Sequence, residues 1–484
     1  MSPPNLNLAL AAPEIFLLIM TCVVMVVDLY TKPEQRENRL LILSILTLAL
    51  VSVGLYQVGV PSVRPRLAFN GMLVIDGMST LLKFAILVSV AMVIIYSRAY
   101  LAARKLFTGE FITLILFATL GMMIMVSANH FISLYLGLEL LALSSYAIVA
   151  LNRDSATSSE AAMKYFILGA LASGLLLYGL SMIYGATGSL DVSRVASVIT
   201  SSKAIDPLVM FGLVFVVSGL AFKLGVVPFH MWVPDVYQGA PTAMTLFIGS
   251  APKLAGFGFI MRILADSLGG AVSDWQGMLV ILAALSMALG NIIAISQTNI
   301  KRMLAYSTIS HMGFLLLGIL AGTKSGYASG MFYIITYVLM TAAGFGMIML
   351  LSRAGFEADN IDDFKGLNQR SPLYAVMMLF IIFSMAGIPP FLGFWAKLAV
   401  LEGALNAGYT WLVVFAVLMS VIGAYYYLRI IKVMYFDAPT DTAPIVSRFD
   451  MRGLLAINAF ALLALGLFPG ALMTACLNAI QVSF

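Results

Sequence analysis

The chain has 484 residues, of which 61% are hydrophobic and 10% are charged, and its formal net charge is +5. A soluble domain carries about 25% charged residues. A chain with so few charged residues could not cover the surface of a soluble fold with polar side chains, so an ordinary soluble fold is excluded. The Lys and Arg residues lie in short loops beside apolar runs, where they set the orientation of a membrane protein. The positive net charge therefore does not indicate nucleic-acid binding.

Apolar runs along the chain predict about fourteen transmembrane helices, because about twenty apolar residues cross a bilayer core. In chain order the helices are predicted at 8–29, 39–59, 75–97, 110–128, 130–151, 160–184, 207–232, 239–265, 275–297, 302–321, 327–352, 372–400, 408–436 and 450–476. The predicted fold class is an all-α polytopic membrane protein. The first run is not predicted to be a cleaved signal, because it lacks a basic segment and carries Glu14 before its apolar stretch.

Lysine and arginine are distributed unevenly between the predicted loops. The loops after odd-numbered helices hold most of them, including Arg98, Arg104 and Arg353, whereas Arg64 and Arg194 lie in loops after even-numbered helices. Because cytoplasmic loops carry the excess of basic residues, the odd-numbered loops are predicted to be cytoplasmic. Both termini are then predicted to lie on the outer side.

Two predicted helices carry proline near the middle of the membrane: Pro228 in the seventh, and Pro389 and Pro390 in the twelfth. Proline removes a backbone donor and breaks or kinks a helix. Helices 4–8 and 9–13 are therefore predicted to form two inverted five-helix repeats, each with one broken helix, as in many transporters. The predicted domains are 1–108 (an N-terminal three-helix segment), 109–266 (the first repeat), 267–437 (the second repeat) and 438–484 (a C-terminal helix).

Four lysines inside predicted helices carry the functional hypothesis: Lys164, Lys223, Lys253 and Lys397. A charge at bilayer depth costs about 2.5–3.5 kcal/mol on insertion scales, and it persists where it is paired or borders water. Lys223 and Lys397 flank the two predicted breaks, Lys253 lies within the eighth helix, and Lys164 lies nearer the cytoplasmic end of its helix. We therefore expect these lysines to carry protons.

Glu139 is the carboxylate expected in the middle of a span, and a buried carboxylate should pair with one of the buried lysines. His230 follows the first break and His311 lies in the tenth helix, so both fall within the expected proton path, although such histidines also serve packing. Lys83 is compatible with either a snorkelling or a structural role. Arg262, near a helix end, is expected to snorkel to the interface.

The sequence predicts no redox centre or nucleotide site in this chain. Its cysteines, Cys22 and Cys476, are too few for an iron–sulfur cluster, which needs four ligands. The sequence has no cluster of Cys and His that would indicate a zinc site. It also has neither of the nucleotide-binding motifs GxGxxG and GxxxxGK[ST]. Redox or ATP energy would therefore come from a partner.

The stretch FKLGVVPFHMWVPDVYQGAPT (222–242) resembles a signature of the antiporter-like subunits of proton-pumping NADH:quinone oxidoreductase, respiratory complex I. Further matches are GLELLALSSYAIVA (137–150), EAAMKYFILGA (160–170), SQTNIKRMLAYSTISHMG (296–313) and AGIPPFLGFWAKL (386–398). The WVPDVYQGAPT form, with a lysine in the eighth helix, looks like the N type among these subunits.

The resemblance implies that Glu139 and Lys223 form an ion pair, that Lys253 links two half-channels, and that Lys397 lies in the outlet half. The first repeat would be the inlet half and the second the outlet half. Protons would move from the cytoplasm to the outside of a bacterial inner membrane. Supporting roles are implied for Lys164, His230 and His311.

The resemblance also implies partners and cofactors. NADH, FMN, iron–sulfur clusters and quinone would be bound by partner subunits and none by this chain. Neighbours would be the M-type and K-type subunits, the lateral helix of the L-type subunit, and lipids. The alternatives are a subunit of a multisubunit cation/proton antiporter or of a membrane-bound hydrogenase, and a passive scaffold. The buried lysines argue against the scaffold, which would gain nothing from such costly groups.

Overall fold

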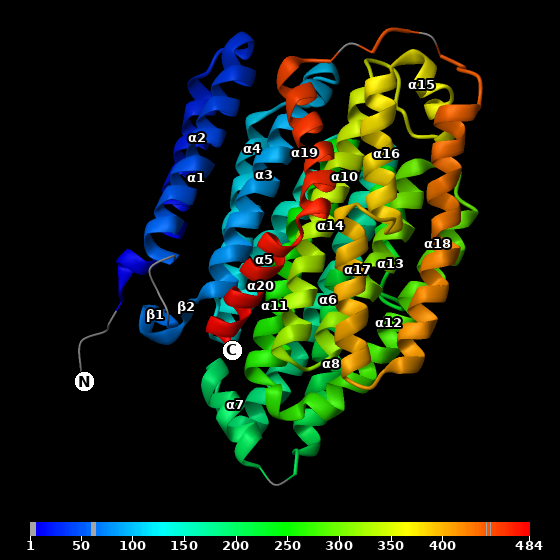
Figure 1. Ribbon diagram of the computed structural model, residues 1–484. Helices are drawn as coiled ribbons and strands as arrows, with labels where there is room; N and C mark the ends of the chain where they lie inside the picture. The colour runs from blue at the N-terminus through cyan, green and yellow to red at the C-terminus, as the bar shows by residue number, and fades with distance from the viewer. Residues whose placement is uncertain (1–5, 60–63, 203, 442, 446) are drawn as a thin grey trace.

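The computed structural model describes residues 6–484 except 60–63, 203, 442 and 446, and in this part the chain forms a bundle of helices (Figure 1). Thirteen of the described helical segments are long and apolar enough to cross a membrane. The pair α16–α17 supplies a further, broken crossing. The prediction of an all-α membrane protein is confirmed, and its inverted repeats stay a prediction.

The N-terminal segment contains three long helices and a small hairpin. Its elements are η1 (Leu8–Ala11), α1 (Ala12–Tyr30), α2 (Pro33–Gly59), β1 (Arg66–Ala68), η2 (Phe69–Gly71), β2 (Leu73–Ile75) and α3 (Gly77–Ala103). The strands pair antiparallel, with Leu67 opposite Val74. In Figure 1, α1 and α2 stand at one edge of the bundle.

Lys83 has a structural role in this segment. Its ammonium on α3 forms an ion pair with the Glu14 carboxylate on α1, and its side chain is only 2% exposed. Such burial leaves the ammonium no route to the interface, so the snorkelling alternative is wrong. The pair ties α1 to α3.

The next part of the chain contains the first broken helix. Its elements are α4 (Gly109–Ser127), α5 (Phe131–Val149), α6 (Ala156–Thr187), α7 (Val192–Ser201), α8 (Pro207–Leu224), α9 (Trp232–Gly239), α10 (Thr242–Gly249), α11 (Ala251–Ile260), the π-helical turn η3 (Met261–Ser267) and η4 (Gly269–Ala271).

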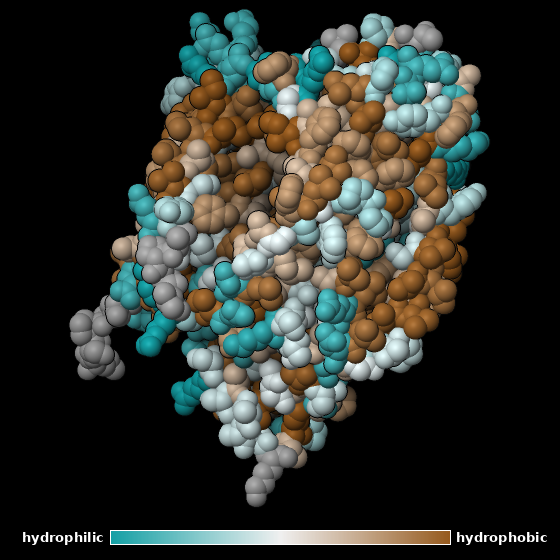
Figure 2. Space-filling model, viewed as in Figure 1, coloured by the Kyte–Doolittle hydropathy of each residue, from teal (hydrophilic) through white to brown (hydrophobic). Residues whose placement is uncertain are grey.

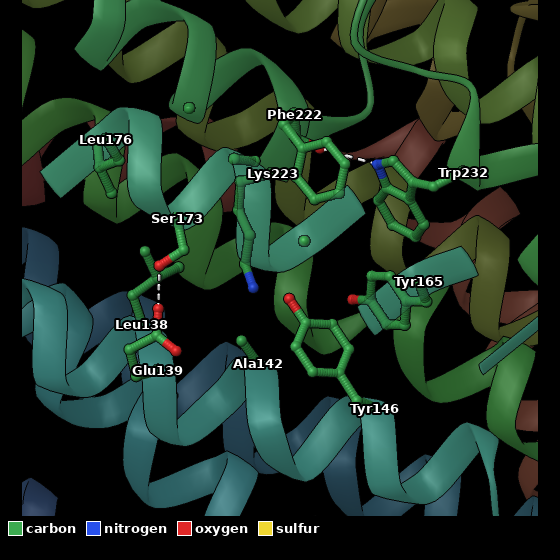
Figure 3. Close-up of a pocket in the computed structure, with 13 residues that line it drawn as sticks. Leu138, Glu139, Ala142, Tyr146, Tyr165, Ser173, Leu176, Phe222, Lys223 and Trp232 are labelled. Atoms are coloured by element: carbon green, nitrogen blue, oxygen red, sulfur yellow. Dashed lines mark hydrogen bonds between the residues drawn. The ribbon is translucent and has the colours of Figure 1, made fainter. Parts of the chain in front are cut away.

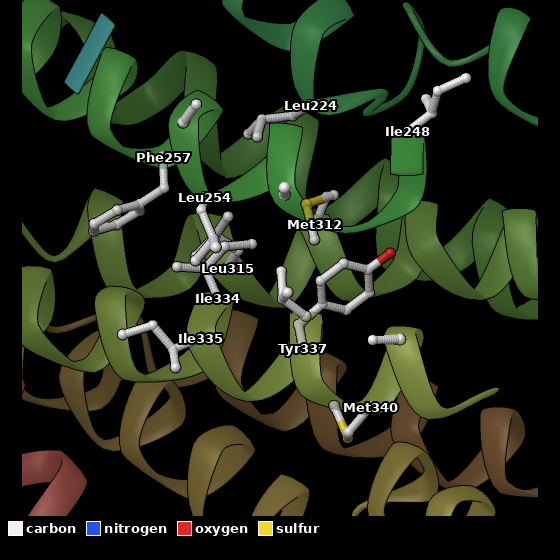
Figure 4. Packing of buried hydrophobic residues seen from close by; sticks show 14 of the residues in the cluster. Leu224, Ile248, Leu254, Phe257, Met312, Leu315, Ile334, Ile335, Tyr337 and Met340 are labelled. Atoms are coloured by element: carbon white, nitrogen blue, oxygen red, sulfur yellow. The ribbon is translucent and has the colours of Figure 1, made fainter. Parts of the chain in front are cut away.

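The remaining elements contain the second broken helix. They are α12 (Val272–Ile295), α13 (Ile300–Leu320), α14 (Lys324–Leu351), η5 (Ile361–Phe364), α15 (Leu367–Arg370), α16 (Pro372–Ala386), α17 (Leu392–Asn406), α18 (Thr410–Phe436), α19 (Phe449–Leu467) and α20 (Gly470–Ser483). The apolar window of α13 is entirely buried. Leu254 of α11, Met312 of α13 and Ile334 of α14 lie in the packed core between these helices (Figure 4).

The two predicted breaks have the same local geometry. α8 ends before Gly225 and α16 ends before Gly387, with φ of +76° and +83°, a left-handed conformation that glycine adopts without steric cost. A cis peptide bond precedes Pro228 and another precedes Pro390. Backbone N–H groups beyond each helix end donate back to it, from Val226 to Ala221 and from Ile388 to Phe383, as in a Schellman motif.

Two further interruptions were not predicted. Ser250 separates α10 from α11 with φ −113° and ψ −97°, and Pro252 just beyond it has no N–H to continue the helical ladder. The predicted helix 450–476 is not one helix, because α19 ends at Leu467 and α20 begins at Gly470 after Pro469.

The predicted snorkelling of Arg262 is wrong. Its side chain is 2% exposed and forms ion pairs of 2.7 Å with Asp76 and 2.8 Å with Asp266. It also donates to the Val126 carbonyl. Two carboxylates and a carbonyl make burial of the guanidinium tolerable, because a buried charge needs partners for its donors.

The visible surface has the distribution expected for a membrane protein. Figure 2 shows apolar side chains over much of the flank, with hydrophilic side chains gathered at the upper end and scattered lower on this face. Large exposed apolar residues such as Ile42, Val421 and Phe449 contribute to this lipid-compatible surface.

Candidate proton pathway

Glu139 and Lys223 line one cavity between α5, α6, α8 and α9. The cavity offers about 30 Å³ to the centres of water molecules, and about 10–15 Å³ suffices for one water. The Lys223 ammonium points into the space bordered by Glu139 and Tyr146 (Figure 3). The structure therefore brings together the carboxylate and the lysine that the sequence singled out, with room for about two waters.

The two groups do not touch. Among the described residues, no ion pair of 4.0 Å or less joins Glu139 to Lys223; the Glu139 carboxylate instead accepts a hydrogen bond from Ser173 of α6. Ser173 also lies 3.2 Å from the Tyr135 hydroxyl. The expected direct pair is therefore wrong for this structure, because a serine satisfies the carboxylate and a cavity separates it from the ammonium. No sequence signal distinguishes Ser173 from other helical serines.

Lys253 is held at the end of the first broken helix. Its side chain is buried and its ammonium donates to the Leu224 carbonyl at 2.8 Å, the last residue of α8. It also lies 5.2 Å from the centre of the Trp232 ring. The carbonyl end of a helix carries partial negative charge and favours a cation. Trp232 lines the Glu139–Lys223 cavity as well, so it lies between the two lysine sites.

Lys397 is held in the same way at the second break. Its ammonium donates to the Ala386 carbonyl at 2.9 Å, the last residue of α16, and to Ser420 Oγ at 3.0 Å. It lies 5.1 Å from the centre of the Phe314 ring. At each break a lysine ammonium thus binds the final carbonyl of the preceding half-helix.

Lys164 belongs to an ion network at one end of the bundle. Its ammonium lies 2.9 Å from Glu160 and 2.8 Å from Asp235, and its side chain is 43% exposed. Asp235 also binds Arg302 at 2.8 Å. The sequence interpretation missed Asp235, although its place in the WVPD motif, just after the first break, was an available signal.

A polar cavity lies beside this network. It offers about 550 Å³ and its lining includes Gln238, Lys301, Glu357 and Asp359. Lys301, which the sequence interpretation placed in a loop, is buried at the start of α13 and donates to the Ala240 carbonyl at 3.1 Å. Burial raises the pKa of Asp359, although Lys301 opposes the shift.

His311 is the centre of a buried hydroxyl network. Its Nδ1 lies 2.7 Å from the Tyr333 hydroxyl and its Nε2 lies 3.0 Å from the Tyr427 hydroxyl. Tyr427 is also hydrogen-bonded to Ser307. Phe314, which lies against Lys397, stacks on Tyr333 at 6.4 Å and 15°. His311 and Lys397 are thus neighbours through two aromatic rings, and the two tyrosines were not singled out from the sequence.

His230 stands apart from these groups. It lies in the non-helical segment between α8 and α9, but it does not line the Glu139–Lys223 cavity. Its Nδ1 is buried, and the backbone of Pro228 lies close to its ring. The structure leaves its predicted supporting role untested.

Nothing in the described residues resembles a metal site, since no three His, Cys, Asp or Glu side chains there could hold an ion. The site consists of ammonium, carboxylate, imidazole and hydroxyl groups around small cavities. These groups can accept, hold and pass protons.

Fold and site together define a class: polytopic membrane proteins in which lysines are buried at the breaks of two discontinuous helices. The family described as NADH:quinone oxidoreductase/Mrp antiporter, TM matches residues 128–423. NADH-quinone oxidoreductase subunit N of Nitrosomonas europaea is 62% identical, covering 98% of this chain and 98% of that protein. The corresponding protein of Thiobacillus denitrificans is 58% identical, covering 99% of each chain.

Solved structures agree with these sequence relatives. A chain of respiratory complex I from Thermus thermophilus with bound aureothin has a TM-score of 0.82 and 30% identity, covering 96% of this chain and 100% of that chain. A chain of the Mrp complex from Dietzia sp. DQ12-45-1b has a TM-score of 0.86 at 22% identity, covering 98% and 97%, and shows the shared fold. The chain belongs to the NADH-quinone oxidoreductase subunit N family, as the sequence motifs predicted.

Proposed function

We propose that this chain is the proton-translocating N subunit of an NADH:quinone oxidoreductase, and that it moves protons from the cytoplasm to the outside. One observation carries the proposal: the ammonium groups of the buried Lys253 and the half-buried Lys397 are each held by the last carbonyl of a broken helix. Keeping such groups inside a membrane is costly. A merely structural subunit would not need two of them at equivalent breaks.

The pathway begins at the ion network around Lys164 and Asp235 and at the neighbouring polar cavity. It continues through the Glu139–Lys223 cavity, whose water-sized volume supports a hydrated proton path. Trp232 borders both this cavity and Lys253. The Lys253 site is thus the next position along the path.

The outlet half runs from the His311 network to Lys397. The imidazole contacts two tyrosine hydroxyls, and Phe314 joins this network to the Lys397 ammonium. A lysine holds its proton more tightly beside a carboxylate and releases it more readily in apolar surroundings. Movement of Lys223 toward Glu139 would therefore draw a proton in, and movement away from Glu139 would drive that proton onward.

The redox chemistry takes place in partner subunits, which bind NADH, FMN, iron–sulfur clusters and quinone. This chain binds none of these groups. Its neighbours are the M-type and K-type membrane subunits, the lateral helix of the L-type subunit, and lipids of a bacterial inner membrane. Both termini face the outer side, as the loop charges predict.

The proposal is tested by purifying the assembly that contains this chain. A tagged chain would be extracted in mild detergent, and the co-purified material assayed for NADH:quinone reductase activity against a mock purification from untagged cells. Activity that follows the tag supports the proposal. A stable assembly without this activity, which exchanges sodium for protons in vesicles, would favour the antiporter alternative.

A further inference from the structure

A second cavity adjoins the polar cavity of the inlet, with which it shares Arg104, and lies where α3 and α14 end and α19 begins. It offers about 280 Å³ and its lining includes the guanidinium groups of Arg104, Arg353 and Arg448. None of the described residues that line it carries a carboxylate. The cavity is therefore lined by three guanidinium groups, and two of them, Arg353 and Arg448, take no part in the proposed proton pathway.

Carboxylates outside the lining hold the arginines in place. Arg104 binds Glu357 at 2.6 Å, and Arg353 binds Asp441 at 2.8 Å. The Ala443 N–H, as the main cause, and Arg353 hold the pKa of Asp441 below its usual value. Asp441 therefore stays ionised near neutral pH and keeps its hold on Arg353.

Arg448 is also held by carboxylates, and some of its guanidinium N–H groups remain free to donate. Its Nη1 binds Glu37 at 2.9 Å, while its Nε lies 3.8 Å from Asp450. Arg353 uses Nη1 for Asp441. The side chains of Arg353 and Arg448 are 46% and 48% exposed, so their remaining N–H groups are available to a ligand.

The deeper wall of the cavity is apolar. It is formed by Ala99 of α3, Met349 and Leu350 of α14, and Met451 of α19. Phe449, beside Arg448, is 91% exposed, and an exposed apolar ring of this size is compatible with contact with lipid. Helix ends, an exposed aromatic residue and arginines above an apolar wall mark the depth of lipid head groups, on the side predicted to be cytoplasmic.

We propose that this cavity binds the phosphate head group of an anionic phospholipid, whose acyl chains follow the apolar wall. Guanidinium groups bind phosphate oxygens through paired, charge-assisted hydrogen bonds, and basic pockets between transmembrane helices bind anionic head groups. The apolar wall favours a lipid over free phosphate, because inorganic phosphate gains nothing from Met349 or Met451.

The test uses the intact purified complex and photoactivatable phosphatidylglycerol, with the label counted on this chain after gel separation. We expect labelling that phosphatidylglycerol competes away and that phosphatidylcholine and inorganic phosphate do not. The double variant R353Q/R448Q should need about thirtyfold more lipid for half-maximal labelling, because each basic residue near a membrane surface contributes about fivefold to the binding of an anionic lipid. Lys432→Gln, at an exposed cation on α18 (side chain 69% exposed), is the matched control and should label normally.

A second variant separates lipid binding from folding. Ala99→Phe fills the apolar wall and leaves every arginine ion pair intact, so it should also reduce labelling while the complex keeps its NADH:quinone reductase activity. Unchanged labelling in both variants would overturn the proposal. Equal competition by phosphatidylcholine would also overturn it, as would displacement by inorganic phosphate alone. A crosslink from the Ser447→Cys variant to another subunit that fills the cavity would have the same consequence.

Discussion

The Lys253→Arg variant distinguishes two roles of Lys253: carrying a proton, and capping the end of α8. Arginine keeps the positive charge and can still donate to the Leu224 carbonyl, which Lys253 contacts at 2.8 Å. It does not release its proton near neutral pH, because its pKa exceeds 12. If Lys253 passes protons, the arginine variant should fold and assemble but not pump.

The size of the effect follows from the protonation cost. Releasing a proton from a group with pKa about 12 at pH 7 costs about 7 kcal/mol, or a factor of about 10⁵ in population. That factor would reduce transfer through this site below detection. Lys253→Met instead removes the charge and leaves the Leu224 carbonyl without its partner, which costs about 1–3 kcal/mol of stability.

The assay is NADH-driven proton uptake by proteoliposomes that contain the complex, measured with a pH-sensitive dye beside the thermal stability of the same preparation. The control is Lys432→Arg at an exposed ion pair on α18, which should pump normally. A Lys253→Arg complex that pumps at the normal rate would refute the reasoning, because its site could not have released a proton.

Three further substitutions test other parts of the structure. Glu14→Gln should destabilise the complex by about 3–5 kcal/mol because it leaves the buried Lys83 unpaired, and adding Lys83→Leu should restore most of the loss in thermal unfolding. Gly225→Ala, at φ +76°, should lower stability by about 1 kcal/mol or more; an unchanged melting temperature would contradict the assigned backbone. Tyr427→Phe removes a hydrogen bond to His311 and should slow pumping several-fold without loss of assembly, whereas full-rate pumping would remove this hydroxyl from the pathway.

The sequence predicted the features that depend on local chemistry. Proline marked both helix breaks, because it acts on its own backbone. The cost of burying charge singled out Lys223, Lys253 and Lys397 without knowledge of their partners. The Pro252 signal was present too, but the prediction did not use it to interrupt the eighth helix.

Contacts between distant segments could not be predicted. Arg262 looked like a residue at a helix end because its partner Asp76 lies 186 positions away in sequence. Lys253 reaches a carbonyl 29 residues away, and which carbonyl it reaches depends on how α8 packs against α11. Ser173, and not Lys223, contacts the Glu139 carboxylate. The packing of α5 against α6 determines which side chain reaches this carboxylate, and the sequence does not reveal that packing.

The lysines inside this helical bundle are proposed to carry protons driven by quinone reduction. The most direct measurement is the rate of quinone reduction together with the protons moved per NADH in proteoliposomes that contain the Lys223→Ala complex. The account predicts that both electron transfer and pumping slow, because a tightly coupled pump stalls when its path is cut. Normal electron transfer with a normal proton yield would contradict it.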